Sequence, residues 1–283
     1  MSDDPEGLHV TIDERIATVM IDSPPINLLT VPMFRGMAGV ARRLADDPGV
    51  RVVVLRSANP DFFIAHFDVE AILSFSTDAP PPTELNAYHE MCETFRTMPK
   101  ATIAVIEGRV GGGGSELALS CDMRFAVLPH GGHPGAVLSQ PEVALGIIPG
   151  GSGTVRLPRL VGRSRALEVI LGCDDVDART AEAWGWVNRA IAADELWPFV
   201  DRLARRIASF PAHAVAAAKA AVLRAERGVT DDLLAEGGAF SGTLGGPGTQ
   251  DAMRAFLAHG GQTRNGELRL GELAGELAGD LAG

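Results

Sequence analysis

Apolar and polar residues alternate along the first part of the chain in a way that predicts strands interleaved with helices. The segment Val10 to Ile21 alternates around a central Asp13-Glu14-Arg15, which predicts a hairpin of two strands. A helical spacing of apolar residues follows from Pro32 to Leu44. The run from Val50 to Leu55 (VRVVVL) is rich in β-branched residues, as is typical of a buried strand. This order favours an α/β fold.

The middle of the chain continues the alternation. The expected elements are a loop and helix over 62–73, a helix over 83–97, a strand over 102–106, a helix over 115–121 and a strand over 123–127. The glycine-rich stretch Gly108 to Gly114 joins the strand to the helix. Strand, glycine loop and helix in that order bring exposed backbone N–H groups to a helix N-terminus, where negative charge is stabilised.

The second half is mostly helical. A second glycine loop, Pro149 to Gly153, precedes expected helices over 155–160, 164–171 and 178–184 and a short strand over 187–191. Residues 195–227 form a nearly continuous amphipathic pattern, interrupted at Phe210-Pro211. We therefore predict a core over 1–194, a helical region over 195–258 and an acidic tail over 259–283. Glycine recurs every fourth or fifth residue in that tail and costs about 1 kcal/mol in a helix relative to alanine, which predicts a frayed or flexible segment.

Composition narrows the class of protein. The 283 residues are 46% hydrophobic, which is enough for one large core. A net charge of −11 with no basic run argues against nucleic-acid binding. The polar N-terminus and the absence of an apolar run of about 18 residues predict a protein that is neither secreted nor membrane-spanning. Three cysteines without CxxC spacing indicate a reducing cytoplasm rather than disulfides or zinc.

The first glycine loop matches no phosphate-binding fingerprint. The stretch Gly108 to Glu116 (GRVGGGGSE) lacks both the Lys-Ser/Thr of a P-loop and the GxGxxG spacing. We expect Glu116 in the first helical turn, where its carboxylate would compete with a phosphate. A carbonyl that develops negative charge only during a reaction suits such a loop better. The alternative is that the glycines only permit close packing and that Glu116 caps the helix.

A second carboxylate stands at Gln140-Pro141-Glu142, seven residues before the second glycine loop. Two buried glutamates near glycine loops supply a base that takes a proton from water and an acid that protonates carbon, as hydration of a conjugated double bond requires. Each glutamate alone could be structural. Together they favour catalysis.

Ordered motifs resemble those of the crotonase, or enoyl-CoA hydratase/isomerase, superfamily over roughly residues 8 to 258. The segments that carry the resemblance are Pro25 to Leu29 (PINLL), Phe63 to Asp68 (FIAHFD), Gly111 to Leu119 (GGGGSELAL) followed by Cys121-Asp122, and Ser139 to Thr154. The resemblance implies a spiral of repeated ββα units with a C-terminal helical region. It also implies trimers or dimers of trimers, no metal and no bound cofactor, with coenzyme A arriving as part of the substrate.

The resemblance also implies roles for individual residues. Glu116 would activate water, Glu142 would exchange the proton at the α-carbon, and the N–H groups of Phe67 and Gly113 would form the oxyanion hole. The residues that would line the channel for the acyl-CoA are Leu28, Ile64, Ala65, His66, Asp68, Gly112, Pro141 and Gly150.

Three features depart from the family pattern. His66 replaces the usual glycine. It is either a loop histidine whose hydrogen bonds are made within the protein or a polar contact to substrate. Phe67 is bulkier than usual and narrows the acyl pocket. An insertion, Pro129 to Gly135, carries His130 and His133, which we expect to be exposed rather than to bind a metal.

Three functions remain open at this point. The leading hypothesis is syn addition of water to a 2-enoyl-CoA. The second is Δ3-Δ2 isomerisation or another enolate reaction, such as C–C cleavage. The third is a non-catalytic oligomeric acyl-CoA-binding protein. The sequence does not identify the acyl group.

Overall fold

The computed structural model describes residues 4–77, 80, 82–226 and 228–280. Two sheets form the centre of the molecule. The larger has six strands in the order β1 (Leu8–Asp13), β2 (Ile16–Ile21), β3 (Val52–Ser57), β5 (Ala101–Ile106), β7 (Met123–Val127) and β10 (Arg189–Ile191). Strands β1 and β2 are antiparallel and the later neighbours are parallel. The smaller sheet contains β4 (Phe62–Ile64), β6 (Arg109–Val110), β8 (Val137–Leu138) and β9 (Val176–Asp177).

The chain passes between the two sheets as a spiral. Strands β3, β5 and β7 of the larger sheet are each followed by a strand of the smaller one, β4, β6 and β8, and then by a helical segment. The α/β fold with repeated ββα units is thus confirmed. The same turns bring the start of each following helical segment to one side of the molecule, where the site described below lies.

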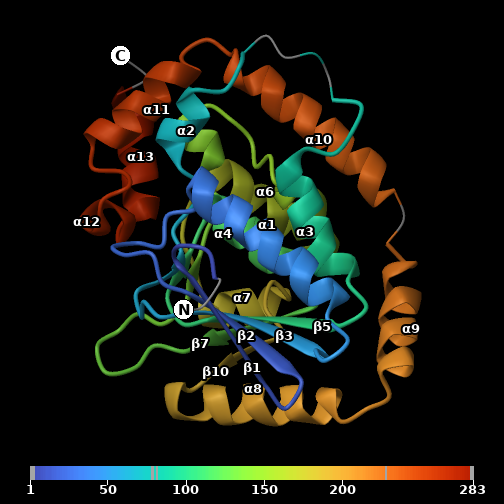
Figure 1. Ribbon diagram of the computed structural model, residues 1–283. Helices are drawn as coiled ribbons and strands as arrows, with labels where there is room; N and C mark the ends of the chain where they lie inside the picture. Colours follow the sequence, from blue (N-terminus) through green and yellow to red (C-terminus); the bar gives the residue numbers. More distant parts are fainter. Residues whose placement is uncertain (1–3, 78–79, 81, 227, 281–283) are drawn as a thin grey trace.

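Helices cover both faces of the larger sheet (Figure 1). They are α1 (Val31–Asp46), α2 (Val69–Leu73), α3 (Ala87–Thr97), α4 (Gly112–Leu119), the short 3₁₀ helix η1 (Glu142–Leu145), α5 (Gly153–Val161), α6 (Arg163–Gly172), α7 (Ala178–Trp184), α8 (Ala193–Ala208), α9 (Ala212–Leu223), α10 (Val229–Leu244), α11 (Thr249–Ala258), α12 (Arg264–Glu267) and α13 (Leu270–Asp280). None of the helices in the described part of the chain has the length and apolar character needed to cross a bilayer.

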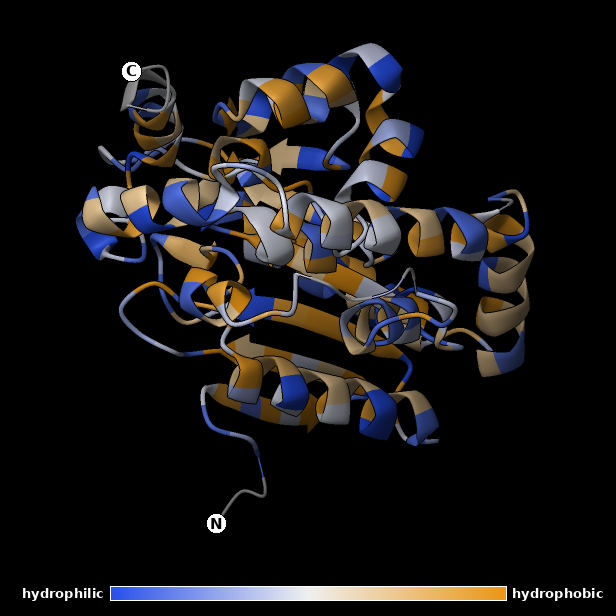
Figure 2. Cartoon of the chain, turned by 90° about the horizontal axis from the view of Figure 1, so that it is seen from above, coloured by the Kyte–Doolittle hydropathy of each residue, from blue (hydrophilic) through white to orange (hydrophobic). Residues whose placement is uncertain are grey.

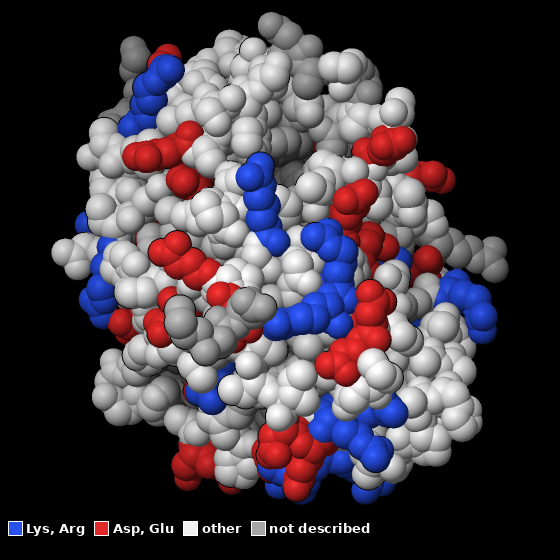
Figure 3. Space-filling model, viewed as in Figure 1, with Lys and Arg blue, Asp and Glu red and all other residues white. Residues whose placement is uncertain are grey.

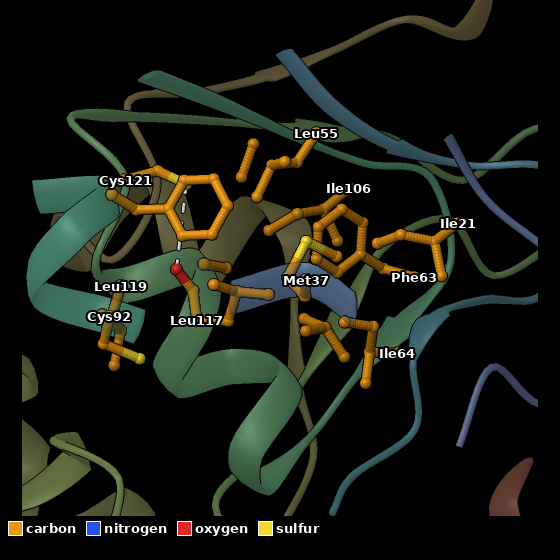
Figure 4. Packing of buried hydrophobic residues seen from close by; sticks show 14 of the residues in the cluster. Ile21, Met37, Leu55, Phe63, Ile64, Cys92, Ile106, Leu117, Leu119 and Cys121 are labelled. Atoms are coloured by element: carbon orange, nitrogen blue, oxygen red, sulfur yellow. Dashed lines mark hydrogen bonds between the residues drawn. The ribbon is translucent and has the colours of Figure 1, made fainter. Parts of the chain in front are cut away.

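Alternation along the strands divides the core between the two faces of the larger sheet. Val53 and Leu55 of β3 face the main core, whereas Val52 and Val54 face α8. Helix α8 meets them with a stripe of residues spaced four apart, Leu196, Val200, Ala204 and Ala208. The hydrophobic strands lie between helices in Figure 2. Figure 4 shows side chains of α1, α4 and the strands interlocked in the main core, which holds α4 firmly in place.

Two helix starts differ from the expected ones for local reasons. Helix α3 begins at Ala87 rather than at residue 83, because the Asn86 side chain accepts a hydrogen bond from the backbone N–H of His89 and caps the helix. Helix α4 begins at Gly112 rather than at Ser115, so Glu116 lies in its second turn and the expectation of a first-turn position is wrong. The core contacts of Leu117 and Leu119 stabilise the glycine-rich first turn.

The expected frayed tail is also wrong for its described part. Residues 264–267 and 270–280 are helical, and Leu270, Leu273 and Leu277 are buried against α2, η1 and α11. These leucines lie on one face at helical spacing, so their burial offsets the cost of the glycines. A side chain at Gly266 would collide with the Gly260 carbonyl, so this glycine is needed for close packing.

Acidic and basic side chains are interspersed over the face of the molecule that Figure 3 shows. The net charge of −11 is therefore not gathered in a single patch on that face.

Candidate active site

The N-terminus of α4 presents free backbone donors to a cavity. Gly112 has a φ of +43°, a conformation that side-chain-bearing residues rarely adopt. A Cβ there would also lie 3.0 Å from Glu142 Oε1. The N–H of Gly113 belongs to the first helical turn, where no intrahelical acceptor is available. This N–H is therefore available to an acceptor in the cavity.

The loop between β4 and α2 holds a second donor. Leu29 N–H donates to the His66 carbonyl at 2.9 Å, and Asp68 N–H donates to the Leu29 carbonyl at 3.2 Å. These bonds fix the peptides on both sides of Phe67, whose own N–H donates to no acceptor among the described residues. A Cβ built on Gly113 would lie 3.5 Å from Phe67 N. The two amides predicted to form an oxyanion hole are thus close neighbours.

Glu116 is buried and fixed by the second glycine loop. The N–H groups of Gly151 and Gly153 both donate to its Oε1 at 2.8 Å. The loop itself is held by Glu236 of α10, which accepts from Ser152 N–H at 2.6 Å and Thr154 N–H at 2.8 Å. Because the bonds from Gly151 and Gly153 engage Oε1 of Glu116, its Oε2 remains available to other partners.

Glu142 is the first residue of η1 and lies on the same cavity. The Gln140 amide, oriented so that its nitrogen faces the carboxylate, donates to Glu142 Oε1 at 3.1 Å and to Oε2 at 3.2 Å. Both carboxylates therefore have fixed positions before any substrate enters.

Burial governs the acidity of the pair. It raises the pKa of Glu142 to about 7, although a backbone N–H and the charge of His66 act in the opposite direction. Burial also raises the pKa of Glu116 well above its ordinary value, and the negative charges of Glu142 and Glu236 add to this effect. Two carboxyl groups on one buried cavity resist simultaneous ionisation, so the pair retains a proton near neutral pH. An acid and a base are then present together.

The cavity has a volume of about 440 Å³ and largely apolar walls. The aromatic rings of Phe34, Phe67, Phe75 and Tyr88 form one wall, with Phe67 and Tyr88 edge to face at 6.0 Å between centroids. The Tyr88 hydroxyl donates to the Gly113 carbonyl, which ties this wall to the start of α4. The site therefore suits an apolar group that ends near the two carboxylates.

The structure separates the predicted site residues into two groups. Those that line the cavity are Glu116, Glu142, Phe67, Gly113, His66, Gly112, Pro141 and Gly150. Those that lie beside it without lining it are Leu28, Ile64, Ala65 and Asp68. Asp68 caps α2 and accepts a hydrogen bond from Gln262, which is a structural role. Leu28, Ile64 and Ala65 keep a channel role only as a prediction.

Four further residues support the site and were not singled out from the sequence. Tyr88, Gly151, Gly153 and Glu236 all contact the carboxylates, their loop or the start of α4. Tyr88 is the single tyrosine of the chain, and this rarity is the one sequence signal that marks it. Nothing local marks Glu236, because its partners lie more than eighty residues away.

The structure shows what surrounds two of the features that depart from the family pattern, His66 and the insertion Pro129 to Gly135. Both ring nitrogens of His66 bind protein groups, which leaves neither free for a substrate. In the insertion, His130 and His133 pair across a short β-bridge, and His133 Nε2 lies 3.5 Å from Asp61.

The raised pKa of Glu142 leads to a stability prediction. A carboxyl whose pKa is near 7 in the folded state and near 4.5 when unfolded stabilises the fold fully only at low pH, and this contribution is lost as the pH rises from about 4.5 to 7. Glu142→Gln is therefore expected to raise Tm by a few degrees at pH 8 and to leave it unchanged at pH 4. Thermal melts of the variant, with the exposed Glu90→Gln as control, test this. A lower Tm at pH 8 would contradict it.

Comparison with known proteins agrees with the geometry. A model of the enoyl-CoA hydratase/isomerase family matches residues 11–259. Crotonyl-CoA hydratase of Syntrophomonas wolfei is 32% identical over 258 residues, which are 89% of this chain and 95% of that protein. A short-chain-enoyl-CoA hydratase of Clostridium acetobutylicum is 31% identical over 86% of this chain and 91% of its own length. A solved structure of a candidate enoyl-CoA hydratase from Streptomyces avermitilis has a TM-score of 0.86 and 38% identity, covering 97% of this chain and 99% of that one.

The two-sheet spiral and the paired glutamates at its edge define a crotonase-type enzyme. The chain belongs to the enoyl-CoA hydratase/isomerase family, whose model spans most of it. The match to that model ends at residue 259, before α12 and α13.

Proposed function

We propose that the protein adds water across the double bond of a 2-enoyl-CoA thioester. The observation that carries this proposal is the meeting of two buried carboxyl groups and two backbone N–H donors on one cavity, where neither donor has an acceptor among the described residues. The N–H groups of Phe67 and Gly113 would donate hydrogen bonds to the thioester carbonyl oxygen and stabilise its negative charge as an enolate forms.

Each carboxyl group then has one task. Glu116 takes a proton from water as the water oxygen bonds to the β-carbon. The electrons of the double bond move to the α-carbon and the thioester oxygen. Glu142 supplies a proton to the α-carbon, which collapses the enolate and gives the 3-hydroxyacyl thioester. One proton enters Glu116 and one leaves Glu142, so the pair holds the same number of protons after the reaction as before.

The proposal requires no metal and no bound cofactor, since coenzyme A enters with the substrate. The channel for its pantetheine arm would run along the backbone of Leu28, Ile64 and Ala65, next to the cavity. We also propose a cytoplasmic site of action, which the three buried free cysteines support.

A second candidate reaction is migration of the double bond between the Δ3 and Δ2 positions. The pKa of Glu142, about 7, suits a single group that both removes and returns a proton at neutral pH. In that case Glu116 would assist without activating water.

A turnover screen separates these functions. The protein is incubated with 2-enoyl-CoA and 3-enoyl-CoA thioesters of different chain length, and the products are analysed by mass spectrometry. Gain of one water supports hydration, whereas an unchanged mass with a moved double bond supports isomerisation. Binding of the thioesters without any turnover would leave the non-catalytic binding protein as the better description.

The bulk of Phe67 leads to a prediction about selectivity. Only its backbone N–H is required in the oxyanion hole, while its ring narrows the apolar end of the cavity. For Phe67→Ala, the kcat/KM for branched or longer acyl groups relative to that for short acyl groups is expected to rise by about 10-fold to 100-fold. This is the usual range when the volume of a hydrophobic pocket changes. Phe199→Ala, on α8 beyond the sheet, serves as the control. Equal loss for every acyl group would show that the ring instead supports the loop.

We further propose a homotrimer or a dimer of trimers. Helix α9 is rich in alanine yet buries none of its side chains, and Val222 at its end is 71% exposed. Leu167 and Leu171 of α6 are also exposed, at 47% and 64%. Such apolar surface is typical of subunit contacts. Light scattering at micromolar concentration is expected to give a mass three or six times that of the chain. A stable monomer would refute this proposal.

A further inference from the structure

His66 is a buried histidine at the position where the family-like motif has glycine. Its side chain lines the reaction cavity together with Phe67 and Glu142. Its ring contacts Phe256 of α11 edge to face, with 5.6 Å between centroids. A second contact, to Glu267 of α12, comes from a segment that lies outside the match to the family model.

The partners of the two ring nitrogens of His66 favour a protonated ring. Nδ1 lies 2.8 Å from the Phe67 carbonyl oxygen, and Nε2 lies 2.9 Å from Glu267 Oε1. A carbonyl oxygen can only accept a hydrogen bond, so Nδ1 carries a proton and donates. A neutral imidazole has no second N–H, so Nε2 can donate to the carboxylate only if the ring is a cation.

The surroundings of the pair agree with this assignment. Glu267 Oε1 also accepts the N–H of Gln262 at 2.7 Å, as suits a carboxylate. Burial lowers the pKa of His66, but the Glu267 carboxylate, the Phe67 carbonyl and the charge of Glu142 together outweigh burial, and the net change is upward. Burial raises the pKa of Glu267, but His66, the N–H of Gln262 and the charge of Arg109 together outweigh burial, and the net change is downward.

The other charged groups near the pair are few. Glu142 of η1 faces His66 across the cavity, and Arg109 of β6 adds positive charge near Glu267. Asp68 lies on the far side of Gln262. Helices α4 and α11 contribute the uncharged Gly112 and Phe256. Among these neighbours, the ring is the group whose positive charge acts on Glu142.

We propose that His66, held as an imidazolium by Glu267, is a positioning residue. It fixes the loop between β4 and α2, which carries the Phe67 N–H, and places a positive charge beside this loop. This role rests on the proposed hydration. The ring bond to the Phe67 carbonyl holds the peptide that follows the oxyanion N–H. The positive charge favours the enolate and keeps Glu142 more acidic than burial alone would make it. Helix α12 thereby contributes to catalysis, because its Glu267 holds His66 in the charged form.

The first experiment measures protonation without any substrate. Long-range ¹H–¹⁵N correlation spectra of histidine-labelled protein report which ring nitrogens carry protons, and His66→Gln identifies the signal of His66. Both nitrogens are expected to be protonated at pH 7.5 in the wild type. In Glu267→Gln the ring is expected to lose one proton at a lower pH than in the wild type. A neutral His66 in the wild type at pH 7.5 would overturn the proposal, whatever reaction the protein catalyses.

The second experiment measures hydration by Glu267→Gln as a function of pH. KM is expected to stay within about threefold of the wild type, while the ratio of variant to wild-type kcat falls about tenfold between pH 6 and pH 8, because the uncompensated ring loses its charge in that range. Asp22→Asn removes the carboxylate 3.8 Å from the exposed His9 and is the matched control, with a flat ratio expected. A flat ratio for Glu267→Gln would mean that the pair is only structural.

A double variant guards against loss of folding. His66→Gln/Glu267→Gln replaces the ion pair by neutral amides that can still bond to each other, and its cooperative melting is checked first. A persistently low kcat at all pH values supports a role for the charge. Recovery of wild-type kcat in this variant would overturn it.

Discussion

Glu116→Gln is expected to suppress hydration by about 10² to 10⁴ while exchange of the α-hydrogen with deuterated solvent continues, and Glu142→Gln is expected to suppress both. The difference follows from the proposed tasks, since Glu116 acts on water and Glu142 acts on the α-carbon. Mass spectrometry of an acyl-CoA recovered from D₂O reports exchange separately from hydration. The neutral amides keep the size of the side chains, so the cavity should retain its shape.

The control for this pair is Glu90→Gln, which removes an exposed carboxylate on α3. It is expected to leave both rates unchanged. Mild and equal effects of less than about tenfold from both active-site variants would show that the two carboxylates are structural. The non-catalytic binding protein would then be the better description of this chain.

Gly151→Ala is expected to lower kcat by about 10²-fold with the fold intact. A Cβ at this position would lie 2.4 Å from Glu116 Oε2 and 2.5 Å from the ring of Tyr88, so the carboxylate must move. Displacing a catalytic group by about 1 Å can cost roughly 10²-fold in rate. Steady-state kinetics together with a thermal melt measure the effect.

Gly39→Ala is the matched control, because a Cβ there meets no atom within 4 Å and α1 gains helix propensity. It is expected to be neutral or slightly stabilising. If Gly151→Ala kept wild-type kcat, the Glu116 carboxylate would not need the position that the second glycine loop gives it.

Much of the fold could be predicted from local pattern. The alternation in β1 and β2, the β-branched run of β3 and the helical spacing of α8 each determine an element, because burial of one face or stripe requires that spacing. The order of elements and the motifs around Glu116 and Glu142 also indicated the family. The glycine spacing of the tail predicted the wrong structure, because the burial of Leu270, Leu273 and Leu277 offsets the low helix propensity of glycine.

The sequence by itself determined the elements, the family and the residues that can carry acid–base chemistry, since these depend on spacing and residue type. Only the tertiary structure decided which groups meet. Glu267 reaches His66 across 201 residues, and Glu236 reaches Ser152 across 84. The acidity of Glu142 likewise depends on burial by distant segments. No local pattern encodes such contacts, because they arise when separate amphipathic faces pack together and bring their polar groups into the same water-free space.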